Sequence, residues 1–330
     1  MRYSGRIAEV FASRIDGRPL FSFWTHVPEV DRDAEALAQA TIVFQREFDL
    51  DFVKTMPNGM YAIEDYGTEI DFSDIPSGGV ARVVTTPFQG ITDWAELRPV
   101  DLTSGAHARE LRSLRLLRQG LGDVPILFTA FSPITIASKL SQGRIREQIA
   151  SGGNRDVLHR ALGRIAADVA RLCAAAIEAG ADGVFFAHQD TGRQVFGPDA
   201  FAEFVEPYDR EALAGARAGR FNVLHLHGED IRFEEAAGYP VDALNWHVWE
   251  TPPAIAAARV ATPKALVGGI DRRLITANDK SGIETQIAAV LEAAGDAGNV
   301  IVTPGCTIRH GFEPDTLHFI RDRLKSASRG

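Results

Sequence analysis

The sequence has few cysteines, no long apolar run and no surplus of basic residues, and each shortage excludes a class of protein. Cys173 and Cys306 are the only two cysteines among 330 residues, which is too few for a disulfide framework and fits a reducing cytoplasm. No stretch approaches about 18 consecutive apolar residues, and the N-terminal segment lacks a signal-peptide core, so neither a membrane span nor export is expected. The formal net charge of −9 argues against a nucleic-acid or anionic-membrane partner.

The sequence is well supplied with short apolar runs that are rich in β-branched and aromatic residues. Eight such runs are predicted as strands, at 21–26, 51–57, 125–131, 182–189, 221–228, 242–249, 264–271 and 299–306. Several are apolar at nearly every position, as expected of parallel strands that are covered on both faces. The clearest segments of helical period are 34–48, 157–180, 199–218, 282–298 and 313–327.

This alternation predicts an α/β protein in which residues 1–330 form a single (β/α)₈ TIM barrel with an N-terminal helix. A doubly wound open sheet is the alternative, but no glycine-rich phosphate loop follows an early strand. Two segments interrupt the alternation, a hairpin and loop region at 58–104 after the second strand and a polar connection at 140–156. Insertions of this kind tend to cover the active face of a barrel.

Polar side chains collect where the predicted strands end, which is the end of a barrel where catalytic sites are built. Five of the nine histidines and one of the two cysteines fall at this rim. The residues concerned are Trp24, His26, Lys54, Ser132, His188, Asp190, His225, His227, His247, Asp271 and Cys306. An even spread of histidines along the chain would not produce this concentration, so it indicates a functional site.

His225 and His227 end the fifth strand and, because strand side chains alternate between faces, they point to the same side. If that side is the lumen, Cys306 at the end of the eighth strand can meet them. Two imidazoles and a thiolate with one open position form a plausible catalytic zinc shell. The alternative is that both histidines bond to backbone carbonyls and that the cysteine only packs.

Several blocks of the sequence resemble the uroporphyrinogen decarboxylase superfamily over nearly the full length. They are ILFTAFSPITIASKL at 126–140, AGADGVFFAHQDTGRQVFGPDAFAEFVEPY at 179–208, ALNWHV at 243–248, LVGGIDRRLI at 266–275 and NVIVTPGCTIRHGFEPD at 299–315. The resemblance implies a (β/α)₈ barrel and places Asp190 on the family's aspartate. It also implies a homodimer, because decarboxylases of the family are commonly dimers.

The chain departs from the decarboxylase pattern at the positions that hold porphyrinogen. The family's arginine-rich motif after the first strand is replaced by WTHVPEVDRD, and the carboxylate after the second strand is absent from VKTMPNG. Cys306 stands where the family has a histidine in the last strand. Decarboxylation by the usual apparatus is therefore not expected.

The superfamily also contains zinc methyltransferases whose motif is H-x-C on strand five with a further cysteine on strand eight. The chain has His225, Leu226 and His227 at the first place and Cys306 at the second. The resemblance therefore implies zinc held by His225, His227 and Cys306, with one thiolate of the family replaced by imidazole. Fewer thiolates make a metal more electrophilic and less thiophilic, so water activation or another divalent metal is also open.

The leading hypothesis is thus a zinc-dependent enzyme that transfers a methyl or one-carbon group to or from a thiol or corrinoid. Asp190, His188 and His247 are the candidates for acid–base or orienting roles, and a corrinoid would be carried by a separate protein. Trp24, His26, Lys54, Ser132 and Asp271 are the candidates for contacts with a small-molecule substrate, although helix capping, packing and solvation also explain them. The alternatives are a metal-free carboxy-lyase and a non-catalytic protein that binds a corrinoid or small molecule.

Overall fold

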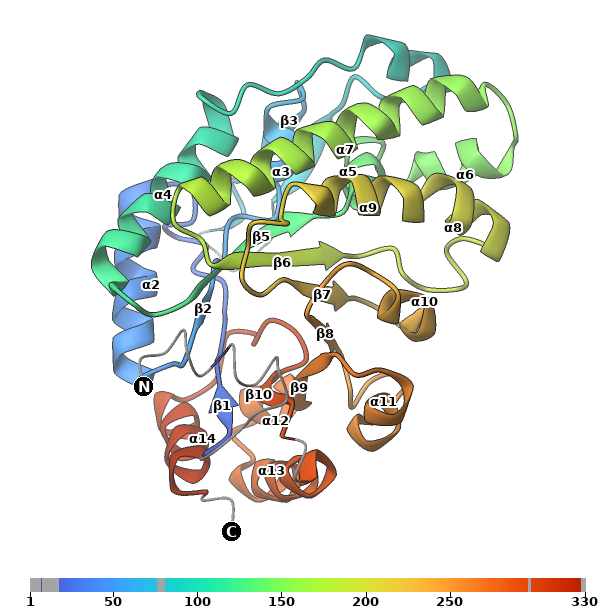
Figure 1. Cartoon of the computed structure of the whole chain (residues 1–330). Coiled ribbons are helices and arrows are strands. Elements are labelled where there is room, and N and C mark those ends of the chain that lie inside the picture. The colour runs from blue at the N-terminus through green and yellow to red at the C-terminus, as the bar shows by residue number, and fades with distance from the viewer. Residues whose placement is uncertain (1–6, 8–17, 76–80, 296–297, 328–330) are drawn as a thin grey trace.

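Eight parallel strands form the centre of the fold (Figure 1). The structure is a computed structural model that describes residues 7, 18–75, 81–295 and 298–327. The strands follow the spatial order β1-β10-β9-β8-β7-β6-β5-β2. They are β1 (Leu20–Phe21), β2 (Val53–Lys54), β5 (Ile126–Phe131), β6 (Gly183–His188), β7 (Val223–Leu226), β8 (Ala243–Trp246), β9 (Ala265–Ile270) and β10 (Val300–Pro304). Each lies within or beside a predicted apolar run, and the prediction of a single (β/α)₈ barrel is confirmed.

The two edges of this sheet, β1 and β2, meet through hydrogen bonds instead of a regular ladder. The amide of Asp51 donates to the carbonyl of Phe21 at 3.1 Å, and the Ser22 hydroxyl donates to the carbonyl of Phe52 at 2.7 Å. The Asp51 carboxylate also accepts the amide of Phe21 at 2.9 Å. These bonds close the ring of strands. Both β1 and β2 are only two residues long, which is shorter than predicted.

Helices separate most of the strands and cover the outside of the ring (Figure 1). They are α2 (Ala34–Phe48), α3 (Tyr61–Glu64), α4 (Gly105–Leu121), α5 (Pro133–Leu140), α6 (Arg144–Ala150), α7 (Arg155–Glu178), α8 (Pro198–Phe204), α9 (Glu206–Ala214), α10 (Phe233–Ala237), α11 (Ile255–Ala261), α12 (Arg272–Thr276), α13 (Lys280–Ala294) and α14 (Pro314–Ser326). The predicted N-terminal helix lies outside the described residues.

Local chemistry explains where several helices begin and end. The side chains of Asp33, Ser132 and Asp271 each accept an amide hydrogen bond from the first turn of the helix that follows. The single helix predicted over 199–218 is wrong, because the chain breaks at Val205 into α8 and α9. Pro207 follows at the start of α9, and proline is tolerated in a first turn but not in a helix interior.

The two segments that interrupt the alternation are more regular than the sequence indicates. Residues 61–64 form the helix α3, and the hairpin comes later, between β3 (Glu69–Asp71) and β4 (Arg82–Thr85), before a 3₁₀ helix, η2 (Ile91–Glu96). In the second segment, α5 directly follows β5, and α6 occupies most of the predicted polar connection at 140–156. The segment was predicted as a polar connection because most residues of α6 are polar, and only Ile145 and Ile149 are buried.

Two layers of apolar side chains pack on opposite sides of the strands. The larger layer lies between strands and helices, and the smaller one fills the barrel interior. The interior layer includes Leu20, Trp24, Phe52, Met56, Leu127, Phe185, Phe221, Val223, Ala243, Ala265, Val267 and Ile301. These side chains fill the barrel interior. A cavity lined by polar side chains of the strands can therefore open only near the carboxyl ends of the strands.

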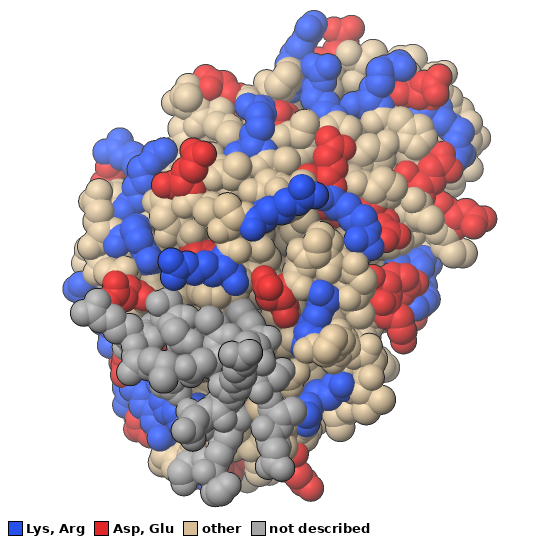
Figure 2. Space-filling view, viewed as in Figure 1, with Lys and Arg blue, Asp and Glu red and all other residues tan. Residues whose placement is uncertain are grey.

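The surface seen in Figure 2 carries lysine and arginine side chains interspersed with aspartate and glutamate. Among the described residues, no helix combines the length and the apolar character that crossing a bilayer requires.

Candidate metal centre

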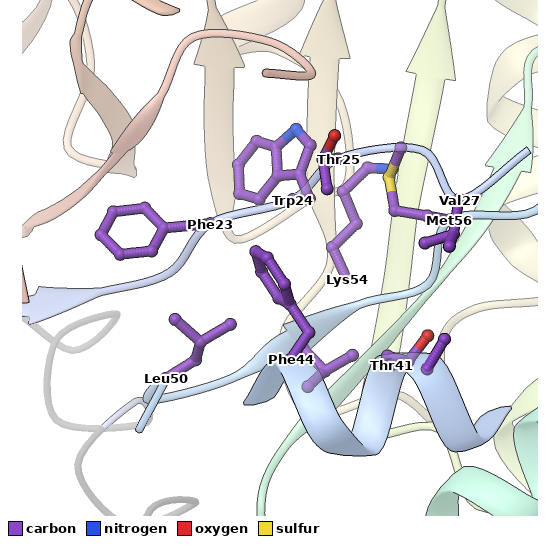
Figure 3. Close-up of a pocket in the computed structure, with 11 residues that line it drawn as sticks. Phe23, Trp24, Thr25, Val27, Thr41, Phe44, Leu50, Lys54 and Met56 are labelled. Atoms are coloured by element: carbon purple, nitrogen blue, oxygen red, sulfur yellow. The ribbon is translucent and has the colours of Figure 1, made fainter. Parts of the chain in front are cut away.

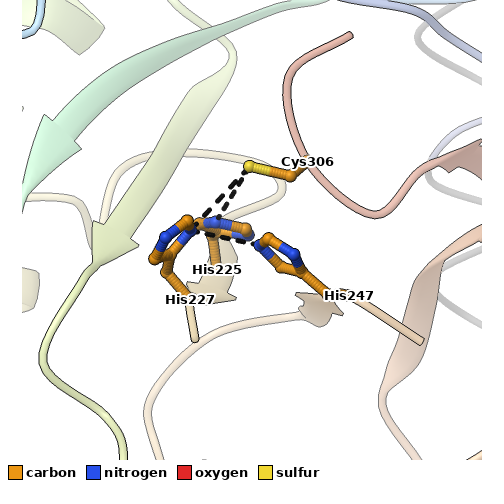
Figure 4. Close-up of side chains that lie close together, drawn as sticks. All are labelled: His225, His227, His247 and Cys306. Atoms are coloured by element: carbon orange, nitrogen blue, oxygen red, sulfur yellow. Dashed lines mark hydrogen bonds between the residues drawn. The ribbon is translucent and has the colours of Figure 1, made fainter. Parts of the chain in front are cut away.

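Four side chains converge at the carboxyl end of the barrel (Figure 4). One ligand atom from each of His225, His227, His247 and Cys306 lies within 4.8 Å of all the others. The Cys306 sulfur is 3.8 Å from Nδ1 of His227 and 4.0 Å from Nε2 of His225, and Nε2 of His247 is 3.1 Å from Nδ1 of His227. The four side chains thus form a group that could hold a metal ion.

Three of the six separations among the four ligand atoms are close to those around a tetrahedral zinc ion. Zinc–nitrogen and zinc–sulfur bonds of about 2.0 and 2.3 Å imply edges of roughly 3.3 Å between nitrogens and roughly 3.6 Å between nitrogen and sulfur. The separations of 3.1, 3.8 and 4.0 Å lie within about half an ångström of these values. Three nitrogens and one sulfur are also the ligand types that zinc prefers.

Three strands supply the ligands. His225 lies on β7, with His227 just beyond it, while His247 and Cys306 follow the last residues of β8 and β10. Gly305 allows the chain after β10 to reach this place, because a Cβ there would lie 2.7 Å from the Trp246 carbonyl oxygen and 2.9 Å from the His247 Cα. A glycine before Cys306 therefore brings the sulfur beside His247.

A second layer of hydrogen bonds orients two of the imidazoles. Nδ1 of His225 is 2.5 Å from Oδ1 of Asn245, whose Nδ2 donates to the Val267 carbonyl at 2.6 Å. Because the amide oxygen only accepts, Nδ1 carries the proton and Nε2 presents a lone pair toward Cys306. Nδ1 of His247 similarly faces Oε1 of Glu250 at 3.3 Å, which leaves its Nε2 toward the cluster. Such outer partners commonly fix metal-binding histidines.

Burial favours the uncharged forms of the four side chains in the cluster. Burial lowers the pKa of His225 well below its ordinary value, with the nearby His227 and His247 adding to the effect. Burial likewise lowers the pKa of His227, and it lowers that of His247 to about 4. For the Cys306 thiol, burial raises the pKa. Neutral imidazole is the form that binds metals, so these histidines would not have to release a proton before binding a metal ion.

A cavity of about 230 Å³ opens beside the cluster. His225, His227 and Cys306 line it, together with Trp24, His26, Lys54, Met56, Pro57, Gly59, Thr129, Phe131, Phe185, Ala187, Gln189 and Thr307. Trp24, His26 and Lys54, three of the predicted substrate contacts, thus lie around one cavity with the predicted metal ligands. The structure brings all six residues together.

Lys54 is the unusual member of this cavity wall. Its ammonium nitrogen has no carboxylate partner among the described residues, and it lies 3.2 Å from the Thr55 carbonyl, 3.0 Å from the Met56 sulfur and 4.7 Å from the centre of the Phe185 ring. Figure 3 shows its side chain running from β2 between Trp24 and Met56, beside a smaller apolar pocket at the seam between β1 and β2. Burial lowers the pKa of Lys54 to about 7, so the uncharged amine is accessible near neutral pH.

His188 was predicted to face the same rim, and it faces away from it. Its side chain is 1% exposed on the outer side of β6, with Nε2 3.1 Å from a carboxylate oxygen of Asp209 on α9. The Tyr239 hydroxyl donates to the same carboxylate at 2.8 Å. Strand alternation explains the position, because His188 pairs in register with Leu226 while Ala187 pairs with His225.

Asp190, Ser132 and Asp271 are not among the residues that line the cavity beside the cluster. The buried Asp190 carboxylate pairs with Arg146 on α6 and accepts the Thr135 hydroxyl at 3.3 Å. Ser132 caps α5, and its hydroxyl contacts that of Thr135 at 2.8 Å. Asp271 caps α12 and binds Arg273 at 2.6 Å. In their described contacts, these three side chains cap helices or bind neighbouring side chains of the protein.

Sequence reasoning missed Asn245 and Glu250, and it assigned His247 a different role. His247 was expected to orient ligands or act as an acid or base, yet its Nε2 lies among the ligand atoms. Asn245 pairs in register with His225, and Glu250 follows His247 by three residues. Asn245 stands two residues before His247, and this spacing was the signal in the sequence. Its role becomes visible only when β7 pairs with β8 and places Asn245 beside His225.

A second, larger cavity of about 720 Å³ continues outward from the first. The two share His26, Gly59 and Thr307 in their walls. The outer cavity is lined further by Pro28, Asp31, Asn58, Met60, Ile75, Ala81, Lys139, Arg272, Ile308, Arg309 and His310. A molecule that reaches the metal-ligand cluster can therefore extend into this larger cavity.

The closed barrel with polar residues at the carboxyl ends of its strands defines an enzyme-like α/β protein, and comparison with known proteins identifies its family. The family model for uroporphyrinogen decarboxylase (URO-D) matches residues 1–327, so the chain belongs to this family. A uroporphyrinogen decarboxylase of Streptomyces coelicolor is 28% identical over 325 residues, covering 96% of this chain and 86% of that protein. A uroporphyrinogen decarboxylase of Sorangium cellulosum is 30% identical over 264 residues, with coverages of 77% and 71%.

Solved structures share the fold at lower identity. A methyltransferase from Methanosarcina mazei superposes with a TM-score of 0.79 at 19% identity, covering 99% of this chain and all of that one. A B12-independent methionine synthase from a Shewanella species superposes with a TM-score of 0.60 at 13% identity, covering 94% and 92%. The members of the family are enzymes, and the two structures confirm the barrel.

Proposed function

We propose that this protein is a zinc-dependent enzyme that transfers a methyl or other one-carbon group to or from a thiol. The proposal rests on the convergence of the ligand atoms of His225, His227, His247 and Cys306. Histidines that only bonded to backbone groups at the ends of strands would have no reason to lie beside a third imidazole and a thiol. The likeness in fold to a methyltransferase supports the same reaction class. A corrinoid protein as the partner and a homodimeric assembly are further proposals.

His225, His227 and Cys306 would hold the metal, and His247 would be a fourth ligand that can yield its position to a substrate. Zinc in such a site supplies Lewis acidity that lowers the pKa of a thiol or of water. Asn245 and Glu250 keep the lone pairs of His225 and His247 directed at the cluster. The apolar walls formed by Trp24, Phe131 and Phe185 exclude bulk water around the reacting group.

Lys54 and His26 would act on the substrate from the same cavity. The uncharged Lys54 amine can accept the proton that a thiol gives up, and its charged form can then pair with an anion. His26 is exposed at the boundary of the cavity, so its ring is available to form a hydrogen bond with a substrate. In this proposal Trp24 packs against the substrate.

Metal analysis of protein purified without chelators tests the proposal. We expect about one zinc per chain in the wild type and less than about a tenth of an equivalent in His227→Ala, because loss of a ligand from a small donor set abolishes tight binding. His159→Ala is the matched control, since His159 lies on the helical surface against Tyr208 and Glu203. Wild-type protein without metal, and unable to take up added zinc, would overturn the proposal.

The names of the sequence relatives favour a second candidate, a carboxy-lyase that acts without a metal. In that case protonated groups would stabilise charge, and Cys306 would be incidental. Incubation of the metal-free protein with a porphyrinogen, followed by measurement of released carbon dioxide, separates the two candidates. We expect no release above that of heat-denatured protein.

A further inference from the structure

We propose that Lys54 is a nucleophilic amine that forms a Schiff base with a small aldehyde or ketone. The site of this reaction is the inner cavity, the space of about 230 Å³ beside the metal-ligand cluster. Removing a lysine amine from water in an apolar pocket activates it as a nucleophile toward carbonyl groups. This activity goes beyond the proposed function, because the Lys54 nitrogen makes the new bond and no metal ion is required.

The course of β2 directs Lys54 toward the barrel interior. Phe52 and Met56, two residues before and after it, both belong to the interior apolar layer, and residues at this spacing along a strand share a face. The partner of Lys54 in register on β5 is Leu127, which belongs to the same layer. Lys54 is also the last residue of β2, so its amine lies at the end of the barrel where catalytic side chains are placed.

The polar partners of Lys54 match an uncharged amine better than an ammonium group. Its nitrogen lies 3.2 Å from the Thr55 carbonyl oxygen and 3.0 Å from the Met56 sulfur. These two acceptors satisfy both N–H groups of the uncharged amine and leave its lone pair free, whereas the third N–H of an ammonium group has no hydrogen-bond acceptor among the described residues. Burial lowers the pKa of Lys54 to about 7, so a large share of the amine has a free lone pair at neutral pH.

Apolar side chains surround the reacting nitrogen. The ring centres of Phe185 and Trp24 are 4.7 and 6.0 Å from it, and Phe131 and Ala187 line the same cavity. Such walls exclude bulk water, which would otherwise hydrolyse an imine. Because a cavity of about 150 Å³ holds benzene, the inner cavity has room for a carbonyl compound of roughly eight heavy atoms. The ligand class is therefore a small aldehyde or ketone with an apolar body.

The reaction balances without an oxidant or a reductant. The lone pair of Nζ forms a bond to the carbonyl carbon while the π electron pair moves to the oxygen, and transfer of one N–H proton to that oxygen gives a carbinolamine. The second N–H proton then leaves with the hydroxyl group as water, and a carbon–nitrogen double bond forms. The products are one imine and one water molecule.

The other four lysines of the chain provide internal references. Lys280 is exposed and Lys325 pairs with Asp49. Lys264 precedes β9 and so lies at the amino end of the barrel. Lys139 is the sharpest reference, because burial lowers its pKa too, but it lines the larger cavity and not the inner one.

Reductive trapping tests the proposal. Wild-type protein is incubated near neutral pH with dilute propanal or butanone and cyanoborohydride, which reduces an imine to a stable secondary amine. Peptide mapping by mass spectrometry then measures the modification of each lysine, as a gain equal to the mass of the carbonyl compound less one oxygen atom. We expect Lys54 to react at least about tenfold faster than Lys280, because the uncharged amine is rare at an exposed lysine near neutral pH. Modification of Lys54 no faster than that of Lys280, or slower than that of Lys139, would overturn the proposal.

Two matched substitutions locate the reaction. Ala187 lines the inner cavity, whereas Ala40 on α2 lines the smaller pocket at the seam, which Lys54 also borders. Ala187→Leu should slow the modification of Lys54 at least about fivefold, because the added carbons occupy the inner cavity, and Ala40→Leu should leave it unchanged. Phe131→Trp makes the same test from another wall if Ala187→Leu fails to fold. Slower modification in Ala40→Leu alone would place the reaction in the seam pocket and contradict the proposal.

Trapping with chelator-treated wild-type protein separates the Schiff base from the proposed function. Selective modification of Lys54 in a protein that binds no zinc would support the nucleophile and refute the metal proposal. Stoichiometric zinc without selective modification of Lys54, before or after chelation, would refute the nucleophile and leave the metal proposal intact.

Discussion

Two histidines that end neighbouring strands, His188 on β6 and His225 on β7, have opposite surroundings. His225 faces the lumen, where it adjoins His227, His247 and Cys306, and its Nε2 lies 4.0 Å from the Cys306 sulfur. His188 faces the helices and lies against Asp209, which also binds Tyr239. The inner group could hold a metal ion, whereas the outer pair links β6 to α9, with Nε2 of His188 3.1 Å from Asp209 but without a well-aligned hydrogen bond among the described residues.

The largest expected effect concerns the outer histidine. His188→Leu should lower the free energy of unfolding by about 3 kcal/mol, because it leaves the fully buried Asp209 without one of its partners. Zinc per folded chain should not change. Denaturant unfolding and metal analysis of the same preparation check both parts. A variant that keeps its stability but loses zinc would reverse the roles assigned to the two histidines.

Gly305→Ala should disturb the inner group through its backbone. The added Cβ would lie 2.7 Å from the Trp246 carbonyl, so we expect about 1–3 kcal/mol of destabilisation together with reduced zinc content. Gly153→Ala is the control, since a Cβ there would meet nothing closer than 3.9 Å. Full zinc occupancy in Gly305→Ala would show that Cys306 does not need this close approach.

Glu250→Gln should weaken zinc binding by about tenfold without unfolding the protein, because a glutamine oxygen polarises the His247 ring less than a carboxylate does. Glu203→Gln is the matched control, because Glu203 contacts His159 in a similar carboxylate–histidine pair on the surface. Competition with a chromophoric chelator measures the affinity. An equal loss in both variants would show that the effect is not transmitted through His247.

The smallest expected effect is a pH dependence that arises inside the barrel. Folding lowers the pKa of Lys54 from 10.5 to about 7, so between these values the unfolded chain binds the proton that the folded chain has lost. Stability from this group therefore rises as pH increases above about 7, by at most about 1.4 kcal/mol per pH unit. Lys54→Met should remove this slope, whereas Lys280→Met should keep it. Unfolding curves at several pH values check the difference, and identical slopes in the wild type and Lys54→Met would contradict it.

The fold could be predicted from the sequence because apolar runs and helical segments each carry a local signal. The eight runs and the three predicted ligands His225, His227 and Cys306 came from such signals together with the family resemblance. The bounds of β1 and β2 and the hairpin after α3 could not, because hydrogen bonds to other segments set them. The break at Val205 had a local signal, Pro207, which the prediction of one helix over 199–218 overlooked.

Facing direction was the weakest part of the prediction for the site. His188 and His225 look alike in sequence, since each ends an apolar strand, and only the registry between β6 and β7 puts one outside and the other inside. Lys54 was expected at the rim, but its lack of a carboxylate partner and its contacts with Met56 and Phe185 depend on how β2 packs in the barrel.

The sequence by itself determined the strands and helices, the barrel and the pairing of two histidines one residue apart on a single face, because these follow from periodicity along the chain. The tertiary structure alone decided that His247 joins them, that Asn245 and Glu250 orient the rings, and that Lys139 and Arg309 line one chamber. Those relations join residues that are far apart in sequence, and only barrel closure brings them within the few ångströms over which ligand bonds and hydrogen bonds act.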